Sequence, residues 1–118
     1  MKIESYKKQV KEKVVSAMLE YMAEAEDCGY SKGAVQKCKR ALFRYLNQLN
    51  KLKNPTQECI MAQVKSVVLA LNALNDKTEG CLIETDAREE IWQIIQDSAV
   101  ECGLSPEVED VTEEWREW

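Results

Sequence analysis

The 118-residue chain contains no histidine, and this absence excludes several catalytic and metal-binding arrangements. Ser-His-Asp and Cys-His catalysis both need an imidazole as general base. The HExxH and Cys₂His₂ zinc sites and the ExxH di-iron site need an imidazole as a metal ligand. Most of the functions that remain are binding functions, so we favour a binding protein over an enzyme.

Glycine, proline and long apolar runs are also scarce. The four glycines and two prolines stand between periodic stretches and form no glycine-rich phosphate loop. No stretch approaches the roughly 18 apolar residues of a membrane-spanning helix, and the first residues do not resemble a secretory signal. The five cysteines are odd in number and form no CxxC pair, which argues against a disulfide framework and a zinc ribbon. We expect one cytoplasmic domain over residues 1–118, with no cofactor and no membrane contact.

Apolar residues recur at steps of three and four along most of the chain, which is the spacing of one face of an α-helix. Four stretches show it: residues 3–26, 32–53, 55–75 and 86–102. Asn54 suits the cap of the third helix and Pro55 suits its first position. The sequence predicts an all-α, single-domain antiparallel bundle of four main helices plus a short C-terminal helix.

Charge is distributed unevenly around a net value of −5. Residues 28–57 hold seven Lys and Arg and no acid, whereas residues 84–118 hold twelve Asp and Glu and only two Arg. On the second helix, four cations share one solvent-facing stripe: Lys37, Arg40, Arg44 and Lys51. Phe43, the only phenylalanine, lies beside this stripe. An aromatic ring among cations is typical of a surface that binds nucleic acid.

The acidic excess argues against that interpretation, because a negatively charged protein repels a polyanion. We expect the acids at the end of the chain to neutralise the stripe, and Phe43 to pack beneath this C-terminal tail, the residues after the fourth helix. Nucleic-acid binding through the second helix is therefore the disfavoured alternative.

The chain ends on two tryptophans among acids, and this segment is the leading candidate for partner contact. Val108, Val111, Trp115 and Trp118 are spaced for a short amphipathic helix that docks on the bundle. The candidate partner-binding residues are Glu113, Glu114, Trp115, Glu117 and Trp118, with Phe43. We expect a protein partner with a basic surface, which this module would cover as an inhibitor of the immunity, antitoxin or anti-defence type. A homodimer through the second helix is compatible with this function.

Acids on the fourth helix suggest one enzymatic alternative. Asp86 and Glu90 share a helix face and are weak candidate ligands for Mg²⁺, as in an all-α nucleotide pyrophosphatase. Such a site also needs an acid from a facing helix, and the third helix has only Glu58 and Asp76 at its ends. We therefore expect no metal site.

Two segments of the last third, IETDAREEI at residues 83–91 and DVTEEWREW at residues 110–118, resemble small bacterial hypothetical proteins of uncharacterised domain families. The resemblance implies a bacterial or phage origin. It carries no activity, cofactor or site residue with it.

Overall fold

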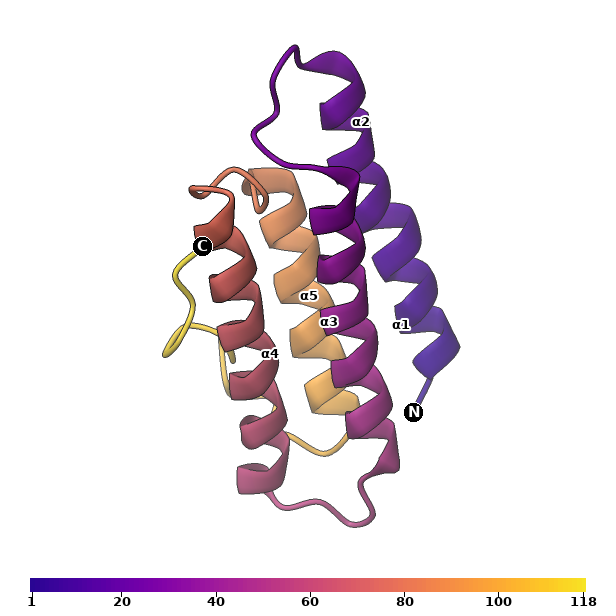
Figure 1. The fold of residues 1–118 in the computed structure, drawn as a ribbon. Coiled ribbons are helices and arrows are strands. Elements are labelled where there is room, and N and C mark those ends of the chain that lie inside the picture. Colours follow the sequence, from indigo (N-terminus) through magenta and orange to yellow (C-terminus); the bar gives the residue numbers. More distant parts are fainter.

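The computed structural model describes residues 1–118 as four long helical segments without a strand. The first segment consists of α1 (Ile3–Gln9), a π-helical turn η1 (Val10–Val15) and α2 (Ser16–Glu24). The other three are α3 (Lys32–Lys51), α4 (Gln57–Lys77) and α5 (Thr85–Glu101). Consecutive helices run antiparallel (Figure 1) and lie close to the predicted bounds, so the all-α bundle is confirmed.

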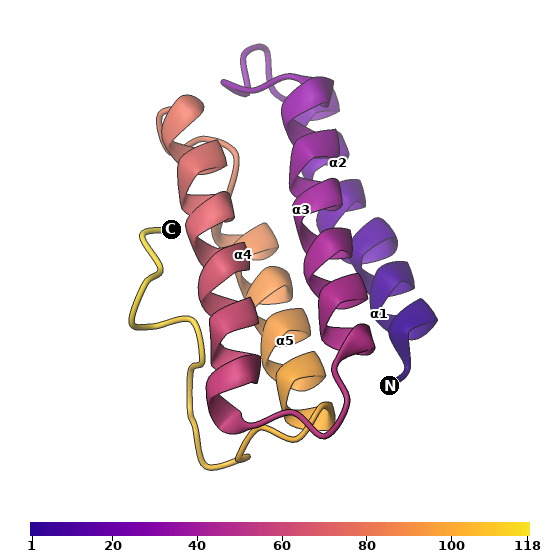
Figure 2. The same cartoon turned by 60° about the horizontal axis from the view of Figure 1, so that its bottom comes forward.

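The helices form a ring in which each packs on the next. The first segment contacts α3, α3 contacts α4, α4 contacts α5, and α5 returns to η1. In Figure 1, α5 therefore lies behind α3 and α4, and the turned view in Figure 2 shows the same order. None of the helices combines the length and the apolar composition that a membrane crossing requires.

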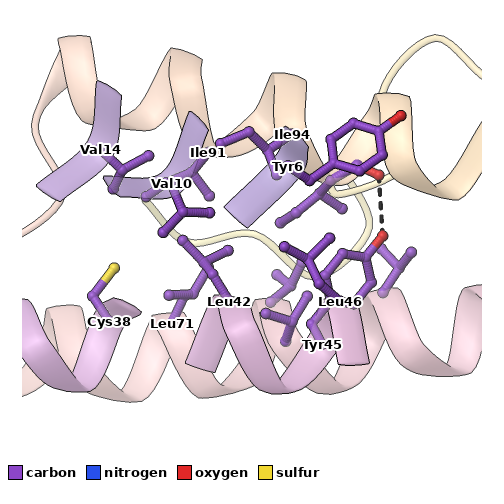
Figure 3. Packing of buried hydrophobic residues seen from close by; sticks show 14 of the residues in the cluster. Tyr6, Val10, Val14, Cys38, Leu42, Tyr45, Leu46, Leu71, Ile91 and Ile94 are labelled. Carbon is purple, nitrogen blue, oxygen red and sulfur yellow. Dashed lines mark hydrogen bonds between the residues drawn. The ribbon is translucent and has the colours of Figure 1, made fainter. Parts of the chain in front are cut away.

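A single cluster of 25 buried apolar residues fills the centre of this ring. Figure 3 shows Val10 of η1 and Leu42 of α3 meeting in it. The buried Tyr45 hydroxyl lies 2.9 Å from the Ser98 hydroxyl, which in turn donates to the Ile94 carbonyl at 2.7 Å. The polar atoms that enter this part of the core are therefore hydrogen-bonded, as buried polar groups must be.

The first helix contains a π-helical turn, and the spacing of its apolar residues explains why. The inward-facing residues follow each other at steps of four: Tyr6, Val10, Val14, Met18 and Met22. In a straight α-helix of 3.6 residues per turn, each such step rotates the side chain by about 40°, so the stripe would drift away from the core. In the wider π turn, the Ser16 N–H donates a hydrogen bond to the Lys11 carbonyl. This turn rotates the apolar stripe back toward the core.

The start of α4 differs from the prediction that Asn54 caps it. Thr56 is the cap, because its hydroxyl accepts a hydrogen bond from the Cys59 N–H at 3.1 Å. Asn54 instead adopts a left-handed conformation with φ of 46°, which asparagine tolerates better than most residues. This turn reverses the chain between α3 and α4 and leaves Pro55 outside the helix, which begins at Gln57.

The predicted short C-terminal helix is wrong, because the chain makes only turns after Glu101. Side chains of the bundle instead form hydrogen bonds with backbone groups of this segment. Gln96 donates to the Val108 carbonyl at 2.8 Å and accepts from the Val111 N–H at 3.1 Å. Gln57 does the same with the Gly103 carbonyl and the Ser105 N–H. The tail consequently runs as a non-helical strip beside α4 (Figure 2).

Two loops meet at one end of the bundle, and we predict that replacing Gly29 there destabilises the fold. Gly29 has φ of +83°, and a Cβ on it would lie 2.7 Å from Cys81 Sγ. Gly29→Ala should therefore add about 1–3 kcal/mol of overpacking to the roughly 1–2 kcal/mol cost of a left-handed alanine. Urea unfolding followed by circular dichroism measures the loss.

Gly80 provides the matched control for this prediction. It has φ of +81° but no atom within 4 Å of the position of a Cβ. Gly80→Ala should therefore show the conformational cost alone. Equal losses for the two variants would contradict the close contact between Gly29 and Cys81.

Candidate functional site

The cations of the predicted stripe lie on the outward side of α3. All four are exposed, and we call them the basic face: Lys37, Arg40, Arg44 and Lys51. They share one side because α3 is a regular helix whose opposite side, from Val35 to Leu49, is buried in the core. Their exposure on one side of the helix is what the sequence pattern predicts.

No carboxylate neutralises the basic face. The protein has only two ion pairs, Lys8 with Glu12 at 3.9 Å and Arg116 with Asp110 at 3.0 Å. The expectation that acids of the tail pair with the stripe is wrong. The physical reason is the path of the tail, which Asn72 and Gln96 hold against α4 and α5.

Phe43 lies toward the first helix and not beneath the tail, which corrects the second part of that expectation. Its half-buried ring has three ammonium groups around it, and we call these four residues the Phe43 cluster. Lys7 Nζ lies 5.4 Å from the ring centroid, Lys11 Nζ 5.7 Å and Lys39 Nζ 5.3 Å. Attraction between a cation and the face of an aromatic ring acts at these distances.

Sequence reasoning missed the two lysines that the first helix adds to the Phe43 cluster, Lys7 and Lys11. Lys7 and Lys11 are one turn apart on the first helix, and Lys39 precedes Phe43 by one turn on α3. This spacing of four was visible, since such residues share a helix face. The sequence did not reveal how the first helix is rotated against α3, so the convergence itself was not predictable.

A groove of about 430 Å³ runs between α3 and α4, beside the basic face. Arg44 and Gln48 line it from α3, and Gln63 and Ser66 line it from α4. No acid lines this groove, so it adds neutral hydrogen-bonding groups to the cations of the basic face. Sequence reasoning did not identify this groove, because it depends on which sides of two separate helices meet.

The tail is docked, and its two tryptophans take part in the docking. Trp115 and Trp118 are half-buried and pack against the core. The buried Asn72 side chain donates to the Trp115 carbonyl at 2.7 Å and accepts from the Glu117 N–H at 3.1 Å. Of the predicted partner-binding residues, the three acids Glu113, Glu114 and Glu117 are the exposed ones.

The acids of α5 do not form a metal centre. Asp86 is exposed and Glu90 half-buried, and no group of three or more Asp, Glu or Cys is placed to hold a metal ion. Glu101 instead accepts a hydrogen bond from the Lys2 backbone N–H at 3.1 Å. The convergence of acids that the nucleotide pyrophosphatase alternative requires is thus missing.

The thiols differ in their chemistry. Hydrogen bonds from Thr56 lower the pKa of the exposed Cys59 thiol below its ordinary value. Burial raises the pKa of Cys38 to about 12. Cys59 has no imidazole near it to act as a base, since the chain has no histidine, so its position alone does not make it a catalytic nucleophile.

A comparison of the chain with protein-family models, curated proteins and solved structures finds no match. The resemblance of the last third to uncharacterised bacterial families stays a prediction. A functional proposal for this chain therefore depends on its own surfaces.

We predict that Asn72→Ala weakens the docking of the tail. The change leaves the Trp115 carbonyl and the Glu117 N–H without their partner, which should cost about 1–3 kcal/mol of unfolding free energy. Chemical denaturation measures this loss, and trypsin cleavage after Arg116 should become faster. Asn47→Ala, on the exposed side of α3, is the control and should change stability by less than about 0.5 kcal/mol. Unchanged stability and cleavage in Asn72→Ala would contradict the role given to this contact.

Proposed function

We propose that the protein is a binding module that contacts nucleic acid through the basic face and the adjoining Phe43 cluster. The observation that carries the proposal is that the four cations of the basic face are exposed, and that neither they nor the lysines of the Phe43 cluster have a carboxylate partner in the fold. Unpaired surface cations are available to exchange their counterions for phosphates, and this exchange supplies most of the affinity of non-specific nucleic-acid binding.

The net negative charge does not oppose this function at short range. The acids are concentrated on α5 and the tail, and α5 lies diagonally across the bundle from α3 (Figure 1). The molecule measures 27 and 21 Å along its two shorter axes, whereas the Debye length at physiological salt is about 8 Å. A phosphate at α3 therefore experiences mainly the nearby cations.

The composition of this surface favours nucleic acid over an acidic protein. The exposed residues between the cations of α3 include Gln36, Asn47, Gln48 and Asn50. Centres of protein–protein interfaces are apolar and poor in lysine. Protein–nucleic acid interfaces are polar, positively charged and hydrated, and the amides of α3 add hydrogen-bond donors for phosphate oxygens.

The proposal predicts a salt-dependent affinity that the basic face controls. A variant in which Lys37, Arg40, Arg44 and Lys51 are all replaced by Gln should bind a fluorescein-labelled oligonucleotide at least tenfold more weakly at 50 mM salt. The slope of log affinity against log salt should fall by up to about 3.6 for a duplex and about 2.8 for a single strand, because each lost phosphate contact removes about 0.9 or 0.7. Fluorescence anisotropy between 50 and 200 mM salt measures both.

The control for this experiment removes cations elsewhere. Lys13 and Lys77 are exposed and lie outside α3, and their replacement by Gln should leave the affinity within about twofold. Circular dichroism should show the same melting for both variants. Absence of binding at 50 mM salt, or an equal loss in the control variant, would refute the proposed function.

A second candidate function is the covering of a basic protein surface by the tail, as an inhibitor would do. The specific observation in its favour is that Glu113, Glu114 and Glu117 are exposed and none forms an ion pair. Exposed charges of one sign steer a partner of opposite charge and raise its association rate.

Charge reversal tests this second candidate. Wild-type protein should capture one stoichiometric protein from a nuclease-treated extract of its own host. The variant Glu113→Lys/Glu114→Lys/Glu117→Lys should lose it, because like charges now face each other. The glutamine variant of the basic face should still capture the same protein. Capture that persists in the charge-reversed variant would refute an inhibitor that acts through the tail.

A further inference from the structure

We infer that the nucleic acid bound by this protein is single-stranded, and that one of its unpaired bases stacks on Phe43 between Lys7, Lys11 and Lys39. This inference rests on the proposed function and specifies the partner of the same surface. It begins from the position of the ring, which is the only half-buried aromatic group among the cations next to the basic face.

The Phe43 side chain is half-buried, so part of its ring is accessible. Three ammonium groups stand 5.3–5.7 Å from its centroid, and ammonium groups keep their hydration. Phe43 also packs against the core, but the core does not enclose it completely. A base that stacks on this ring therefore takes the place of an ammonium group that now lies over it. The displaced ammonium group stays close enough to bind a phosphate beside the base.

The cations of the cluster come from two helices, and this arrangement suits the two chemical parts of a nucleotide. Lys7 and Lys11 approach the ring from the first helix and Lys39 approaches it from α3. None of the three has a carboxylate partner. The three ammonium groups repel one another. Phosphates on either side of a stacked base would supply the negative charge that offsets this repulsion.

A duplex does not fit this site as well as a single strand. Bases in a duplex are already stacked and paired, and Phe43 is half-buried on a helix and does not project from the surface as an intercalating wedge does. Proteins that bind single strands combine a positively charged path with aromatic platforms on which bases stack. The basic face leads from the Phe43 cluster along α3 and supplies such a path.

The experiment separates base stacking from phosphate binding. Fluorescence anisotropy compares three probes of equal length: an oligothymidylate, an abasic oligomer with the same phosphates, and a duplex. Wild-type protein should bind the oligothymidylate about tenfold more tightly than the abasic oligomer, since stacking of one base contributes about that factor. Phe43→Leu keeps an apolar side chain and should bind both single strands with the affinity that wild type has for the abasic one.

Further variants keep the result interpretable. Phe43→Tyr retains the ring and should retain the preference for bases, which guards against a Leu variant that fails to fold. Tyr21→Leu changes an exposed aromatic residue on α2 and should have no effect on either probe. Lys7→Gln/Lys11→Gln should weaken binding of both single strands by a similar factor, because it removes phosphate contacts.

The outcomes distinguish this inference from the proposed function. Equal affinity of wild type for the oligothymidylate and the abasic oligomer would overturn the inference, and so would an unchanged preference in Phe43→Leu or a tighter affinity for the duplex. Phosphate binding, and with it the proposed function, would still stand. Failure of the wild-type protein to bind any of the three probes would instead refute the proposed function itself.

Discussion

The paired hydrogen bonds of Asn72 hold the last residues of the chain against α4, and the charge layout of the whole molecule depends on this contact. The amide is buried and joins both the carbonyl of Trp115 and the N–H of Glu117. Leaving these two partly buried backbone groups without a hydrogen-bond partner would cost folding free energy. The contact therefore holds the tail in place against α4. Its carboxylates are thereby kept away from α3.

The consequence is a molecule whose two sides differ in charge, although its net charge is only −5. The basic face lies on α3, which holds no acid, whereas twelve of the 21 acids lie in residues 84–118, which include α5 and the tail. A net charge averages over both sides and describes neither. Local potentials decide which partners approach a surface when the molecule is thicker than the Debye length.

Helical regularity accounts for the parts of this structure that could be predicted. The helices follow from the spacing of apolar residues, and the exposed stripe of Lys37, Arg40, Arg44 and Lys51 follows from a 100° rotation per residue. The π turn of the first helix also had a sequence signal, the steps of four from Tyr6 to Met22. Spacing was misleading at the tail, where Val111 and Trp115 fit a helix but Gln96 and Asn72 bind the backbone instead.

The sequence by itself determined which segments are helical, which side of each is apolar, and where the charges of each sign are concentrated along the chain. These properties are local, because hydrogen bonds and side-chain rotation within one helix set them. The tertiary structure alone decided that Lys7 and Lys11 meet Lys39 around Phe43, and that the acids of the tail leave the basic face uncovered. Such contacts join residues far apart in the chain, and they depend on how each element is rotated and placed against its neighbours, which no local pattern encodes.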